Sequence, residues 1–308
     1  MLIVTPADFN ASPTAASTLL QWVRSTDGQQ VDDHGECALT LLPRDDELVL
    51  VLPPRALSWH RIALPRVNAA RLRAALDGLL EDRVLGDVEA LHHALAPGGR
   101  PGETVWVATG EKTRLRAWVH LLEKSGRSVA RIAPSLWPLL ESPVPVSASG
   151  VSRSFGFDEP TNLHWVHADG DQVWLCSASV LGVSCVPLPD GVGTPPPMGA
   201  LLPAGNDPAS PAGSFDTWMA DPALAAMAEG LFNRRFEPVA PSAWLLRAGQ
   251  TDWNLAQFDL SLSSKARRTQ RFKRLWRDFR RAPAWRAARW GLAAMVAVQI
   301  AGLNAAAW

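Results

Sequence analysis

The chain of 308 residues has no tyrosine and only three cysteines, Cys37, Cys176 and Cys185. Three cysteines without a Cys-x-x-Cys pair support neither a disulfide framework nor a zinc site, and their scarcity suits a reducing compartment. The sequence also lacks the phosphate-binding pattern G-x-x-x-x-G-K-[ST]. These absences argue against a small secreted scaffold and against an enzyme that holds nucleotide in such a loop.

Residues 290–308 lack any ionisable side chain, although the stretch before them is densely basic. As a helix, this segment would be about 28 Å long, close to the ~30 Å thickness of a hydrocarbon core. We therefore expect residues 290–308 to form a transmembrane helix, with Trp290 and Trp308 at the two membrane interfaces. The alternative is a buried, alanine-rich helix of a soluble domain.

The segment before the expected span, residues 263–289, is predicted to form a basic juxtamembrane helix. It holds eleven lysines and arginines and one acid, which leaves 19 basic and 29 acidic side chains in residues 1–264. Positive charge beside a span favours the cytoplasmic face and binds anionic lipid, whereas an acidic body disfavours nucleic acid as a partner. The side chains expected at the lipid headgroups are Arg267, Arg268, Arg271, Lys273, Arg274, Arg277, Arg280, Arg281, Arg286 and Arg289.

Alanine recurs at every fourth position along the expected span. Small residues at this spacing let two helices approach closely in lipid, which would favour self-association. Simple enrichment in alanine explains the same spacing equally well. The positions concerned are Ala293, Ala297, Ala301 and Ala305.

Hydrophobic periodicity indicates that residues 1–145 and 146–262 form two α/β lobes. In the first lobe, one amphipathic helix should begin after Asn68 and end at Gly86, and a second should occupy residues 111–124. Short apolar segments between turn residues predict its strands. These cover residues 18–24, 36–42, 47–52, 57–64, 89–95, 104–109 and 128–133.

The second lobe is expected to open with three strands, over residues 162–168, 172–177 and 180–187, as the first lobe does. This similarity suggests a duplicated topology. The Pro- and Gly-rich residues 189–214 should form a long loop, and Pro222 should open a helix that runs to residue 235.

The few residues that could carry chemistry in the body have ordinary structural explanations. His164 and His167 are three apart in an expected strand, so their side chains should lie on opposite faces and cannot share a metal. Adjacent His92 and His93 have the same limitation. Asp169-Gly170-Asp171 is typical of a hairpin turn. We therefore expect no catalytic, cofactor-binding or metal-binding residues.

Several segments together resemble the inner-membrane protein L of the bacterial type II, or general, secretion pathway. They are residues 55–66 (RALSWHRIALPR), 71–83 (RLRAALDGLLEDR), 129–134 (VARIAP) and 254–260 (NLAQFDL). The resemblance follows the order of the whole chain and implies a two-lobed, actin-like (ribonuclease-H-like) cytoplasmic region followed by one transmembrane helix. The family also has a small periplasmic domain, which this sequence, ending at Trp308, is expected to lack.

The resemblance implies that the chain is not an enzyme. Members of this family recruit the cytoplasmic secretion ATPase, protein E, to the inner membrane and pair there with the bitopic protein M. The resemblance leaves the residues of the ATPase docking surface unspecified.

A second hypothesis is a membrane-anchored, actin-like ATPase or a relative of the sugar kinases. Such a protein needs acidic, glycine-containing phosphate loops near the first strand of each lobe. Residues 1–9 contain none, and Asp169-Gly170-Asp171 is the one candidate in the second lobe.

Overall fold

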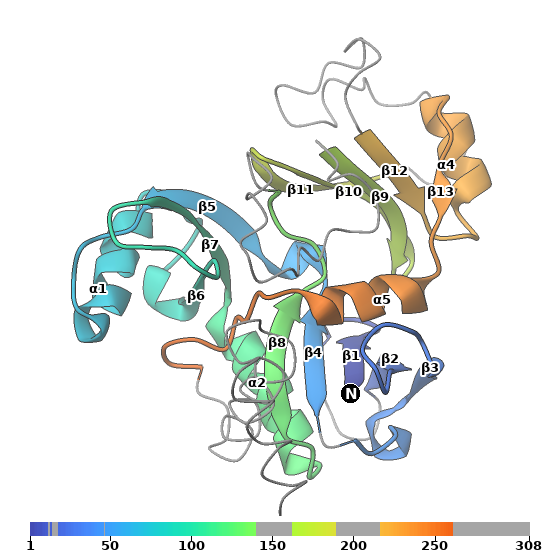
Figure 1. Cartoon of the computed structure of the whole chain (residues 1–308), viewed down its shortest axis with the longest axis horizontal. Coiled ribbons are helices and arrows are strands. Elements are labelled where there is room, and N and C mark those ends of the chain that lie inside the picture. The colour runs from blue at the N-terminus through green and yellow to red at the C-terminus, as the bar shows by residue number, and fades with distance from the viewer. Residues whose placement is uncertain (12, 14–17, 46, 140–161, 189–215, 261–308) are drawn as a thin grey trace, which may run out of the picture.

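The computed structural model describes residues 1–11, 13, 18–45, 47–139, 162–188 and 216–260 (Figure 1). The fold is mixed α/β, as predicted, with two five-stranded sheets and one three-stranded sheet. The strands are β1 Leu2–Pro6, β2 Leu19–Arg24, β3 Asp33–Ala38, β4 Leu48–Leu52, β5 Ser58–Ala63, β6 Leu91–Leu95, β7 Thr104–Glu111, β8 Val129–Pro134, β9 Asn162–Asp169, β10 Gln172–Ser179, β11 Gly182–Pro187, β12 Asp216–Ala220 and β13 Glu237–Pro238. The α-helices are α1 Ala69–Leu80, α2 Lys112–Lys124, α4 Ala225–Phe232 and α5 Pro241–Gln250, and the 3-10 turns are η1 Leu39–Leu41, η2 Pro54–Ala56 and η3 Val88–Ala90.

The first five-stranded sheet has the order β3-β2-β1-β4-β8, with β1 antiparallel to β2 and parallel to β4. Alternate residues of its central strands point to opposite faces. Leu2 and Leu50 pack in the cluster that contains Trp118 of α2, whereas Ile3 and Val49 pack against α5. The sheet is therefore covered on both faces, which explains why every residue of β4 is buried.

The second five-stranded sheet has the order β11-β10-β9-β12-β13. The three strands that come first in sequence, β9, β10 and β11, pair antiparallel to one another. The two later strands, β12 and β13, run parallel to β9, and the first sheet has the same arrangement. The duplicated topology suggested by the sequence is therefore confirmed. In Figure 1, α5 lies between the two sheets although it follows the second sheet in sequence.

The three-stranded sheet β5-β7-β6 forms a separate layer with α1, at the left of Figure 1. Leu76 and Leu80 of α1 are fully buried against Val107 and other apolar residues of this sheet. As predicted, Asn68 caps α1: its side-chain oxygen accepts a hydrogen bond from the Arg71 N–H at 3.0 Å.

Helix α2 matches its prediction closely. Its four buried apolar residues are the expected Leu115, Trp118, Val119 and Leu122. Gly126 follows the helix with φ +80°, and the Arg127 N–H donates to the Leu122 carbonyl at 3.1 Å. This is the hydrogen bond of a Schellman C-cap, which satisfies a carbonyl at the helix end.

Several predicted boundaries were wrong. Strand β3 ends at Ala38, because the following residues turn into η1 and bury Leu39. Helix α1 ends at Leu80 rather than at Gly86, and α4 begins at Ala225, so Pro222 lies before the helix. The periodicity of the apolar residues continued past the points where the backbone leaves the helical or extended conformation.

Some expectations concern residues outside the described part of the chain. The juxtamembrane helix, the span with Trp290, Trp308 and its alanines, and the loop over residues 189–214 all lie there, as does the boundary at residue 145. Among the helices that the structure describes, none combines the length and the apolar character needed to cross a bilayer.

Close packing of α5 on β1 gives a testable prediction. A Cβ atom at Gly249 would overlap Cδ1 of Ile3 and lie 2.8 Å from its Cγ1. We expect Gly249→Ala to lower the free energy of unfolding by about 1–3 kcal/mol, measured by chemical denaturation, because the core is already filled. Gly230→Ala, in α4, is the matched control: beyond its chain neighbours and its own helix, no atom of the described residues lies within 4 Å of the added Cβ, so helix propensity should raise stability by up to ~1 kcal/mol. Equal effects of the two substitutions would contradict the packing.

Candidate functional site

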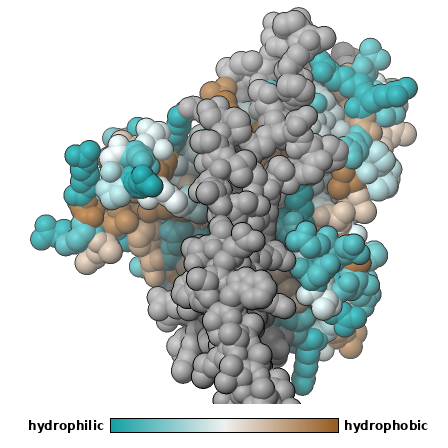
Figure 2. All heavy atoms as spheres, in the orientation of Figure 1, coloured by the Kyte–Doolittle hydropathy of each residue, from teal (hydrophilic) through white to brown (hydrophobic). Residues whose placement is uncertain are grey.

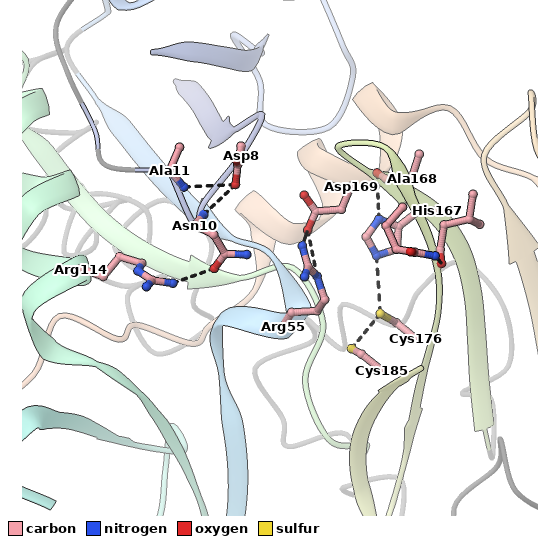
Figure 3. Close-up of polar contacts among 12 residues, drawn as sticks. Asp8, Asn10, Ala11, Arg55, Arg114, His167, Ala168, Asp169, Cys176 and Cys185 are labelled. Carbon is pink, nitrogen blue, oxygen red and sulfur yellow. Dashed lines mark hydrogen bonds and ion pairs between the residues drawn. The ribbon is translucent and has the colours of Figure 1, made fainter. Parts of the chain in front are cut away.

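The candidate site lies where the two five-stranded sheets meet, at the turn between β9 and β10. Arg55, in η2 directly after β4, extends toward Asp169 at the end of β9 (Figure 3). Its Nε donates to Asp169 Oδ2 at 3.1 Å, and its Nη2 donates to the same oxygen. This ion pair links residues that are 114 positions apart, one from each sheet region.

Trp174 on β10 completes the environment of this cation. The Arg55 guanidinium carbon lies 4.2 Å from the centre of the Trp174 ring, a cation–π distance. The side chains of Arg55 and Asp169 are only 25 % and 10 % exposed. A charge-assisted pair with this little solvent contact is stronger than a surface salt bridge, and it fixes the β9–β10 turn against the first lobe.

The loop after β1 faces the same junction from the other side (Figure 3). The Asp8 carboxylate accepts hydrogen bonds from the backbone N–H groups of Asn10 and Ala11 at 2.8 and 3.2 Å. The side-chain oxygen of Asn10 accepts a hydrogen bond from Arg114 at 2.6 Å. The two N–H groups that could have faced a ligand are thus bonded to Asp8 within the loop.

His167, Cys176 and Cys185 form a compact group beside the ion pair (Figure 3). The His167 ring stacks on Trp165 with centroids 4.0 Å apart, and burial lowers its pKa to about 4. Cys176 Sγ lies 3.5 Å from His167 Nε2 and 2.8 Å from Cys185 Sγ. The imidazole is therefore neutral near pH 7 and faces a pair of thiols.

The chemistry of an actin-like phosphate site is not supported by these contacts. Such a site needs an acidic turn whose carboxylate can reach a metal-bound phosphate. Asp169, the candidate in the second lobe, is already paired with Arg55. Asp221, near the same hairpin, accepts a hydrogen bond from the Ala168 N–H, and burial raises its pKa to about 6.

The histidine pairs lie as the sequence predicted, on opposite faces of their strands. His164 Nδ1 contacts Ser177 Oγ at 2.8 Å and its ring stacks on Trp218, whereas His167 stacks on Trp165. His92 Nε2 contacts the Leu255 carbonyl at 2.6 Å. In the described part of the chain, no group of three or more metal-ligating side chains comes together.

Surface hydropathy does not single out a docking surface on the face drawn in Figure 2. Hydrophilic side chains cover much of its coloured surface, and hydrophobic positions occur in small groups between them. Small exposed apolar groups among polar side chains are normal on a protein surface.

A protein-family model and two curated relatives that match this chain name the same family. Residues 13–146 match the family model described as Type II secretion system (T2SS), protein L. A Type II secretion system protein L of Dickeya chrysanthemi is 31 % identical over 90 residues, which are 29 % of this chain and 22 % of that protein. Another, from Klebsiella pneumoniae, is 28 % identical over 168 residues, 53 % of this chain and 41 % of that protein. The matched segments thus span less than half the length of these relatives.

Among solved structures, the fold resembles the cytoplasmic domain of EpsL, described as an inner-membrane component of the type II secretion system of Vibrio cholerae. The match has a TM-score of 0.53 at 20 % identity and covers 85 % of this chain and all of that domain. At this identity the likeness concerns the fold alone.

Proposed function

We propose that this chain, whose resemblance to protein L of the type II secretion system the comparisons confirm, is a non-catalytic platform component of that system at the inner membrane. Its body recruits the cytoplasmic secretion ATPase, protein E. The basic segment and residues 290–308 anchor that body and pair it with the bitopic protein M. The family match supports the platform role, whereas recruitment, the partners and the anchor are our inference.

The observation that carries the non-catalytic assignment is the ion pair between Arg55 and Asp169. It neutralises the acidic turn at the place where the rival hypothesis, an actin-like ATPase, needs a free carboxylate. The same contact holds the second sheet against the first. A rigid pair of lobes suits a protein that presents a fixed surface to a motor, because partners that are already ordered lose less entropy on binding.

Fractionation of bacteria that express the chain together with the secretion ATPase tests this proposal. We expect both proteins in the membrane pellet, with the ATPase in the supernatant when the chain is absent. The matched control is the double variant Ala297→Arg, Ala301→Arg, because each arginine at the centre of a span costs roughly 2.5–3.5 kcal/mol on insertion. With this variant, the ATPase should remain in the supernatant.

Two outcomes would contradict the proposal. An ATPase that stays soluble beside the membrane-bound chain would exclude recruitment. Calorimetric binding of ATP and magnesium at micromolar concentration by the purified chain would favour the actin-like ATPase instead.

A further inference from the structure

The two cysteines of the second lobe face each other across an antiparallel hairpin. Cys176 on β10 pairs directly with Cys185 on β11, and their sulfur atoms are 2.8 Å apart as free thiols (Figure 3). Directly opposed residues of an antiparallel pair have Cβ atoms about 4.5–5.5 Å apart, near the range in which a disulfide closes with little backbone movement. The backbone therefore already holds the two thiols in bonding register.

His167 supplies a proton acceptor for this pair. Its Nδ1 contacts the Ala168 carbonyl at 3.2 Å, and a carbonyl only accepts, so Nδ1 carries the ring proton. The lone pair of Nε2 is then directed to Cys176 Sγ, 3.5 Å away. Stacking on Trp165 fixes the ring in this orientation.

The two thiols differ in their access to solvent. Cys176 is fully buried, whereas Cys185 is partly exposed. Burial raises the pKa of the Cys176 thiol well above its ordinary value, so this group stays protonated. A small oxidant must therefore react first at Cys185, and Cys176 can act only on the product of that reaction.

We propose that Cys176 and Cys185 form a redox-modification site, which a hydroperoxide oxidises to a disulfide and a small thiol reduces again. The Cys185 thiolate attacks one peroxide oxygen, the O–O bond breaks, and the leaving hydroxide takes a proton and departs as water. Cys176 Sγ then attacks the sulfur of the sulfenic acid while His167 Nε2 takes its proton and passes it to the leaving hydroxide. Two thiols are oxidised to one disulfide, and one hydrogen peroxide is reduced to two waters.

Peptide mass spectrometry of the full chain in detergent tests this site. The reduced protein is treated with hydrogen peroxide at a small molar excess, and the remaining thiols are alkylated. We expect a linked peptide pair that contains Cys176 and Cys185, lighter by two hydrogens and restored by dithiothreitol. Cys37, on β3 of the other five-stranded sheet, should remain fully alkylated.

Matched variants separate this site from general thiol oxidation. Cys185→Ser should abolish the linked peptide, and Cys37→Ser should leave its yield unchanged. His167→Gln should give the same product several-fold more slowly, because a proton acceptor is lost. The linked peptide from the wild-type chain tests the proposal even if a variant fails to fold. Two results would overturn the proposal. One is oxidation of Cys185 to the sulfinic acid while Cys176 is recovered as the alkylated thiol, and the other is oxidation confined to Cys37.

Discussion

Replacing Arg55 with methionine is expected to lower the free energy of unfolding by roughly 2–3 kcal/mol. Methionine keeps an apolar side chain over Trp174 but leaves the Asp169 carboxylate, 10 % exposed, without its cation. Breaking a fully buried ion pair from one side costs about 3–5 kcal/mol, and the 25 % exposure of Arg55 places this pair below that range. Chemical denaturation followed by tryptophan fluorescence measures the loss.

Arg24→Met is the matched control for this substitution. Arg24 pairs with Asp33 at 3.3 Å, but these side chains are 45 % and 50 % exposed, so removing the cation should cost no more than about 1 kcal/mol. The double variant Arg55→Met, Asp169→Asn should recover much of the stability lost by Arg55→Met, because no unpaired charge remains buried. If Arg55→Met is as mild as Arg24→Met, the ion pair does not hold the lobes together.

Long periodic helices and hairpins with clear turn residues were predictable from the sequence. The β9–β10 turn at Gly170 has φ +63°, which is why Asp-Gly marked it so clearly. Strand β1 and helix α5 were missed. Both contain only short apolar runs, Leu2–Val4 and Ala243–Leu246, and such runs do not separate strand from helix. Their conformations depend on each other, because α5 packs directly on β1.

The ion pair at the candidate site could not be predicted in the same way. Arg55 and Asp169 meet only because two sheets are placed side by side, and no local pattern encodes a contact over 114 residues. The Cys176–Cys185 contact could not be predicted either. The expected strands over residues 172–177 and 180–187 leave residues 178 and 179 for the turn, whereas Ser179 pairs with Gly182 in the structure, and this register sets the two cysteines opposite each other.

Acidification should destabilise the fold well before the carboxylates on its surface titrate. Burial lowers the pKa of His93, His164 and His167 to about 4, from about 6.5 in an unfolded chain. Between these values the unfolded chain binds protons that the folded chain excludes. Each histidine therefore removes roughly 1.4 kcal/mol of stability per pH unit as the pH falls from 6.5 toward 4.

Asp221 acts in the opposite direction. Burial raises its pKa to about 6 from 3.8, so its carboxylate destabilises the fold at pH 7, and that cost shrinks by roughly 1.4 kcal/mol per pH unit as the pH falls from 6 toward 3.8. Between pH 6 and pH 5, the stability gained through Asp221 offsets the stability lost through about one histidine. Two histidines remain, so the free energy of unfolding should fall by roughly 2–3 kcal/mol between pH 6 and pH 5.

Denaturation of the full chain in detergent at pH 7, 6 and 5 measures this loss. His164→Gln removes one buried imidazole and should reduce the loss between pH 6 and pH 5 by about 1.4 kcal/mol, whatever its effect at pH 7. His120→Gln, at an exposed position of α2, should leave the pH profile unchanged. A stability that stays constant from pH 6.5 to 5, or identical profiles for the two variants, would mean that these histidines are not held neutral by burial.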